Sequence, residues 1–201
     1  MILKDIDFKE FFEHTRDIFS KHFSKEEVNQ IMEYVEILAD ANFRCYRANM
    51  IVIDGRKLNK AAIVQSDFNL YKLIAEMEWV ARSVGEFRVS SKARINKFIA
   101  DTRPKTNPSV TSANNYSWVS DDVVYSIGEM MDRLSIEYIK REDFRVNNRA
   151  KHMTESCQAL SDRVEQYLSA KLVEIHEKGY YECIHEQRTY DLEGIVEELV
   201  I

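Results

Sequence analysis

Apolar side chains recur at steps of three and four residues along almost the whole chain, and this spacing constrains the fold more than any other feature. The spacing places apolar residues on one face of an α-helix, whereas a half-buried strand would need a period of two. Only 5 of the 201 residues are glycine and only 2 are proline, so few positions favour breaks or tight turns. We therefore predict an all-α protein, a bundle of about six or seven helices in a single domain over residues 1–201.

Two stretches interrupt the helical pattern. Residues 50–56 combine β-branched side chains with Asp54-Gly55, which favours a short irregular or β-ribbon insert near 50–60. Residues 101–118 are rich in Ser, Thr and Asn and contain both prolines, which predicts a long polar loop. The pattern places helices over residues 6–19, 66–85, 120–144 and 191–199. It places a further helix from Ser24 to about Asn42. Another begins at Ser90, and the long helix that follows residue 144 ends at about Gly179.

Charge is distributed unevenly along the chain. The formal net charge is -6, from 28 basic and 34 acidic residues, which argues against a general nucleic-acid coat. Residues 82–105 are nevertheless basic, whereas residues 182–201 hold six acids and one base, Arg188. A basic middle can steer an anionic molecule or a protein partner towards itself. Acidic ends facing this basic middle, within the fold or across a subunit contact, would explain the same pattern. The predicted binding residues are Arg88, Lys92, Arg94, Arg103, Lys105, Trp118 and Arg133.

The longest apolar runs have four residues, whereas a membrane-spanning helix needs about 20. Acids near the N-terminus argue against an export signal, and we predict a cytoplasmic protein without a membrane contact. A near-heptad apolar seam over 157–175 suits antiparallel packing in the bundle or a dimer contact, and we expect a homo-oligomer. Trp79 lies in a periodic helix and is predicted to be a core residue, whereas Trp118 ends the polar loop.

Residues 126–140 are the most distinctive segment. They contain Gly128-Glu129, Asp132-Arg133-Leu134-Ser135-Ile136 and Lys140. This pattern resembles a segment of uncharacterised all-helical bacterial or phage proteins, and the resemblance implies no activity. Glu129, Arg133 and Glu137 lie at four-residue steps, so they can form a charged ladder along one helix. Arg133 could hold an external anion, or the ladder could fix helix packing.

Two further patterns point to hydrolysis of nucleotides or RNA. Arg145 and His152 are seven residues apart, and this pair resembles the ribonuclease motif of the HEPN family. The resemblance implies that His152 acts as acid or base while Arg145 stabilises phosphate charge. Glu33-x-x-Glu36 and Glu129-x-x-Asp132 resemble the magnesium-binding carboxylate pairs of all-helical nucleotide pyrophosphatases.

Two function classes therefore remain from the sequence. The first is a non-catalytic binding protein that recognises a small anionic ligand or a protein partner through the basic middle. The alternative is a hydrolase, with Glu129, Asp132, Arg145 and His152 as candidate catalytic residues. Glycine-rich phosphate loops and paired Cys-x-x-Cys motifs are missing from the sequence, and we predict no cofactor and no resident metal.

Overall fold

The computed structural model describes residues 6–61, 68–102, 126–146 and 151–178. These residues form five α-helices and no strand, which confirms the predicted all-α class for this part of the chain. The predicted count of six or seven helices is not supported, and the short helix expected over 191–199 lies outside the described residues. The helices are α1 (Lys9–Ser20), α2 (Lys25–Ala61), α3 (Phe68–Thr102), α4 (Ile127–Val146) and α5 (Lys151–Lys178).

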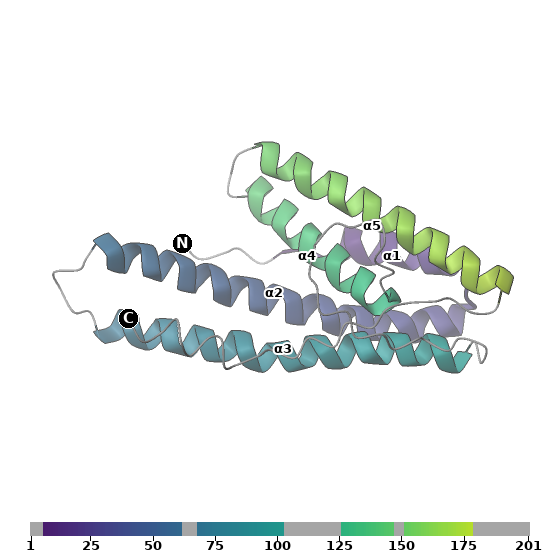
Figure 1. Ribbon diagram of the computed structural model, residues 1–201, viewed down its shortest axis with the longest axis horizontal. Coiled ribbons are helices and arrows are strands. Elements are labelled where there is room, and N and C mark those ends of the chain that lie inside the picture. The colour runs from purple at the N-terminus through teal and green to yellow at the C-terminus, as the bar shows by residue number, and fades with distance from the viewer. Residues whose placement is uncertain (1–5, 62–67, 103–125, 147–150, 179–201) are drawn as a thin grey trace, which may run out of the picture.

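A long antiparallel hairpin of α2 and α3 forms the base of the molecule (Figure 1). The other helices cover the half of this hairpin that holds the start of α2 and the end of α3. Helix α4 contacts both hairpin helices, α5 packs antiparallel on α4, and α1 packs against α2. None of the described helices combines the length and the apolar character that crossing a membrane requires.

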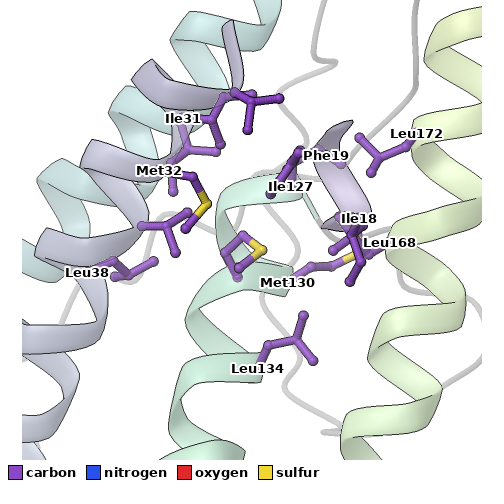
Figure 2. Close-up of a cluster of buried hydrophobic side chains, with 14 of the residues drawn as sticks. Ile18, Phe19, Ile31, Met32, Leu38, Ile127, Met130, Leu134, Leu168 and Leu172 are labelled. Carbon is purple, nitrogen blue, oxygen red and sulfur yellow. The ribbon is translucent and has the colours of Figure 1, made fainter. Parts of the chain in front are cut away.

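The core forms where the helices meet, because each contributes one apolar stripe (Figure 2). Phe19 of α1 and Leu38 of α2 are fully buried there, as are Ile127 of α4 and Leu172 of α5. The seam over 157–175 supplies Leu168, Leu172 and Ile175 to this core. The seam therefore packs inside the chain, and these three residues are not available for a dimer contact. The homo-oligomer stays a prediction.

Helix α2 starts as the sequence predicts and continues past the predicted end. Ser24 and Glu27 form the expected capping box, with the Ser24 N–H donating to the Glu27 Oε2 atom at 2.8 Å. The predicted irregular or β-ribbon insert near 50–60 is wrong, because α2 continues without interruption to Ala61. Val52 is buried in this stretch. Packing against α3 outweighs the few tenths of a kcal/mol that a β-branched residue costs in a helix.

Helix α3 is one helix where the sequence predicts two. The expected stop at Gly85 and the expected new start at Ser90 both lie inside its continuous run from Phe68 to Thr102. Gly85 has open space around it and a helical backbone, so it tolerates the helix at a cost of about 1 kcal/mol. Extended packing on α2 offsets that cost. The polar loop predicted at 101–118 starts within α3, and its residues 103–118 lie outside the described part.

Candidate functional site

Helix α4 carries the distinctive segment through the centre of the protein, and most of its length is buried. Its buried side chains include five polar or charged ones, Asp132, Ser135, Glu137, Glu142 and Asp143. Burying a charge without a partner is costly, so each of these groups requires hydrogen bonds or an ion pair. The contacts of α4 therefore decide whether the segment builds a binding site or holds the fold together.

Gly128 allows α4 to cross α3 at very close range. A Cβ atom at this position would lie 2.5 Å from the Lys92 carbonyl oxygen and 3.0 Å from Asn96 Oδ1. The Gly128 N–H donates to Asn96 Oδ1 at 2.8 Å, and Asn96 Nδ2 donates to Ser126 Oγ at 3.0 Å. Asn96 thus satisfies the Gly128 N–H, one of the first N–H groups of α4 that lack a carbonyl partner within the helix, and also bonds the Ser126 hydroxyl. Gly128 and Ser126 serve the contact between these two helices.

Asp132 faces the basic residues of α3. Arg88 Nη2 lies 2.9 Å from Asp132 Oδ2, and Arg88 Nε lies 3.3 Å from Asp132 Oδ1. Lys92 Nζ lies 3.9 Å from the same carboxylate, and the Arg88, Lys92 and Asp132 side chains are only 19%, 19% and 12% exposed. Two of the predicted anion-binding cations are therefore paired with an acid of the chain itself. This ion-pair cluster joins α3 to α4.

Asn42 extends the cluster to α2. Its Nδ2 atom donates to Asp132 Oδ1 at 2.8 Å and lies 2.7 Å from Ser135 Oγ. Asn42 is 2% exposed, and its Oδ1 atom has no hydrogen-bond partner among the described residues. Asn42 follows Val35 and Leu38 at helical spacing, so it is a polar residue on an otherwise apolar stripe. This position in the sequence could have identified Asn42 as a buried polar residue. We name Asn42, Arg88, Lys92, Asp132 and Ser135 the polar core.

A second buried acid, Glu137, is shared by two cations of its own helix. Arg133 Nη2 and Lys140 Nζ each lie 3.0 Å from Glu137 Oε1, and the Glu137 side chain is 2% exposed. The predicted ladder is thus present between Arg133 and Glu137. Its third member differs, because Glu129 Oε2 accepts instead from the Ser126 N–H at 3.5 Å, as in a capping box.

Cys157 of α5 packs against this second acid. Burial, together with a hydrogen bond to Glu137, raises the pKa of the Cys157 thiol to about 11. The reactive form of cysteine is the thiolate, so a thiol with this pKa is nearly inert at neutral pH. Cys157 therefore holds the packing of α5 on α4 and is a poor nucleophile.

A thiol-labelling experiment tests this assignment. At pH 7.5, iodoacetamide is expected to modify Cys45, which is half-buried, much faster than Cys157. Labelling of Cys157 should become fast in denaturant, because unfolding exposes the thiol and lowers its pKa towards 9.0. Peptide mapping by mass spectrometry separates the two sites. Equal labelling rates in the native protein would contradict the buried contact with Glu137.

The remaining predicted site residues do not converge on one place. Arg94 lies exposed on α3 and makes no ion pair with another described residue. Arg145 lies in α4, where its Nη2 atom is 2.6 Å from Glu142 Oε2. His152 lies in the next helix, α5, so Arg145 and His152 do not share one continuous helix. Arg103, Lys105, Trp118 and the His152 side chain lie outside the described part.

The predicted carboxylate pairs also differ in environment. Glu33 and Glu36 are exposed on α2, whereas Asp132 is buried against Arg88. Among the side chains that the structure describes, no group of three or more His, Cys, Asp or Glu residues is placed to hold a metal ion. Glu129 and Asp132 contribute to helix capping and to the polar core instead.

The exposed side of α3 is the feature that the sequence interpretation missed. Trp79, predicted as a core residue, is 70% exposed, and Phe87 and Val89 are 62% and 56% exposed. At 100° per residue, both lie within about 80° of Trp79 around the helix, while Arg88 lies on the opposite side. If the helical spacing is continued through Gly85, the sequence places Trp79, Phe87 and Val89 on one side of the helix and Arg88 on the other. We define the outer face of α3 by seven exposed residues, Trp79, Arg82, Glu86, Phe87, Val89, Arg94 and Lys97.

Comparison with known proteins adds no relative to this description. The chain matches no protein-family model, no curated protein and no solved structure.

Proposed function

We propose that the chain is a non-catalytic binding protein that recognises a protein partner through the outer face of α3. The observation that carries the proposal is the exposure of Trp79 and Phe87 on a helix whose opposite side is packed into the fold. Exposed apolar side chains that gather on one face of a helix are typical of protein-binding surfaces. The partner is expected to be acidic, with apolar side chains at the centre of its contact surface.

The composition of this face supports a protein contact. Tryptophan and arginine are the residue types most enriched among positions that dominate binding energy, and a polar rim around an apolar centre is typical of interfaces. Trp79, Phe87 and Val89 supply the apolar part. Arg82, Arg94 and Lys97 are exposed beside them and make no ion pair within the described part of the chain.

The pairing of the other cations favours a protein partner over a small anion. Arg88 and Lys92 face Asp132, and Arg133 faces Glu137. An anion binding at these side chains would have to displace a buried carboxylate, which would leave that charge without a partner. Arg82, Arg94 and Lys97 are spread over about four turns of α3, too far apart to surround one small molecule.

Site-specific photo-crosslinking tests the proposal. A benzoylphenylalanine at position 79 is expected to form an adduct with one defined protein in the cells that make the chain. The same probe at position 173 is the control, because Val173 is 41% exposed on α5, away from this face. The adduct at position 79 should disappear when Phe87→Ser and Arg94→Glu are added, while the thermal unfolding of the protein stays unchanged.

Two results would contradict the proposal. One is an identical set of adducts at positions 79 and 173, because this would indicate random collision. The other is an adduct at position 79 that survives Phe87→Ser and Arg94→Glu, because the rest of the face would then contribute nothing.

A further inference from the structure

We propose that the outer face of α3 binds a second copy of this chain, through an exposed acidic face on the α2 helix of that copy. The inference rests on the proposed function, because it names the acidic partner assigned to this surface. One chain thus carries both halves of the contact, and the contact joins α2 of one molecule to α3 of another.

The first half of α2 has an acidic face opposite its buried stripe. Ile37 is 44% exposed in this half, whereas Val35 and Leu38 beside it are buried. At 100° per residue, Glu33 lies about 40° from Ile37 around the helix, so acids and an apolar side chain share one surface. We define the acidic face of α2 by six exposed residues, Glu26, Glu33, Glu36, Ile37, Asp40 and Arg44. Acids around an apolar side chain complement the cations and aromatic rings of the outer face of α3.

The two faces match in length when the two helices lie antiparallel. Glu26 of one copy can lie level with Lys97 of the other. Arg44 then comes level with Trp79, because both spans cover the same number of residues. Each span is about 27 Å long at a rise of about 1.5 Å per residue. One end of the contact is therefore an ion pair, and at the other end the Arg44 guanidinium can stack on the Trp79 ring.

Three further pairs come to within about 6 Å of the same level in this alignment. They are Ile37 with Phe87, Asp40 with Arg82, and Glu33 with Arg94. At 100° per residue, the apolar pair falls on one flank of the contact and the Asp40–Arg82 pair on the other, so matching flanks face each other. Trp79 and Arg94, about 22 Å apart along α3, contact different residues of α2. The match therefore runs along the whole outer face.

The remaining charges leave the two faces opposite in sign. Glu86 follows Arg82 by one helical turn, so Arg82 can bond Glu86 of its own helix or an acid of the other copy. Arg16 of α1 stands beside the acidic face, where its Nη1 atom lies 2.6 Å from Asn29 Oδ1. The acidic face has four acids against Arg44, and the outer face of α3 has three cations against Glu86. Salt at physiological strength screens charges beyond about 8 Å, so these local charges outweigh the net charge of -6 on each chain.

Sedimentation equilibrium of the full chain, with a reductant present, tests the contact. The weight-average mass should rise with concentration above that of one chain. Glu33→Lys and Arg94→Glu should each weaken the association about tenfold, because like charges then face each other. Both residues are exposed, so thermal unfolding should stay unchanged. Glu177→Lys makes an equal charge change at an exposed site of α5, and this control should leave the association unchanged.

A mixture of the two weakened variants shows which faces meet. In the mixture, α2 of the Glu33→Lys chain meets α3 of the Arg94→Glu chain with opposite charges, and the two unchanged faces also match. Mixing should therefore restore the wild-type association, although each variant alone associates poorly. A contact of α3 with α3 would not respond to Glu33→Lys at all.

The second copy is ruled out as the partner by any of three outcomes. They are the mass of one chain at every concentration, variants that associate as well as the Glu177→Lys control, and a mixture that associates as poorly as its components. The proposed function has its own readout, because an adduct at position 79 to a different protein can form while the chain stays monomeric. With a second copy as partner, that adduct has the mass of two chains.

Discussion

Gly128→Ala is expected to destabilise the protein by about 3 kcal/mol, because there is no room for a side chain between α4 and α3. The added Cβ atom would lie 2.5 Å from the Lys92 carbonyl oxygen, which belongs to helix backbone and cannot rotate away. Overpacking of this kind typically costs about 1–3 kcal/mol. The hydrogen bond from the Gly128 N–H to Asn96 would be strained as well. Urea unfolding followed by circular dichroism measures the change in the midpoint.

Gly85→Ala is the matched control for this prediction. Gly85 also lies inside a helix, but no atom lies within 4 Å of the position that its Cβ would take. The substitution should stabilise the protein by roughly 0.5–1 kcal/mol, because alanine favours the helix more than glycine does. A Gly128→Ala protein as stable as Gly85→Ala would show that α3 and α4 do not approach this closely.

Asp132→Ala is expected to cost about 3–5 kcal/mol, the usual loss when one partner of a buried ion pair is removed. The substitution leaves Arg88 and Lys92, both mostly buried, without the carboxylate that they face. It also removes an acceptor of the Asn42 amide on α2. The loss therefore reaches three helices at once, and the measurement is again the free energy of unfolding in urea.

An exposed aspartate–arginine pair provides the comparison. Asp40 Oδ2 lies 2.8 Å from Arg44 Nε on α2, and these side chains are 57% and 64% exposed. Because solvent screens such a pair, Asp40→Ala should cost no more than about 0.5 kcal/mol. Similar losses in the Asp40 and Asp132 variants would contradict the burial of the polar core.

Local patterns were enough to predict the helices that bury one stripe. The Ser24–Glu27 capping box and the apolar stripe from Val28 to Leu38 predict the start of α2 and its buried side. The stretch from Met50 to Gly55 misled the prediction, because the strand preference of β-branched residues depends on context and packing against another helix overrides it here. The partner is α3, far along the sequence, and a short-range pattern carries no information about it.

In the candidate site too, local features could be predicted from the sequence, whereas contacts between distant residues could not. The basic middle was visible as a sum of charges, but the roles of Arg88 and Lys92 depend on Asp132, an acid far away along the sequence. Asp132 was singled out as a carboxylate, and the segment around it proved to be the centre of the fold. The exposure of Trp79 followed from the continuity of α3 through Gly85, which the composition of that region argued against.

Arg88 is held inside the fold by Asp132, so binding is left to the outer face of α3. A double-mutant cycle with Arg88→Met and Asp132→Leu measures the coupling free energy of this pair directly. We expect a coupling of at least about 1.5 kcal/mol, within the range of residues in contact. A coupling near zero, with full stability in Arg88→Met, would contradict the claim and return Arg88 to the candidate ligand-binding residues.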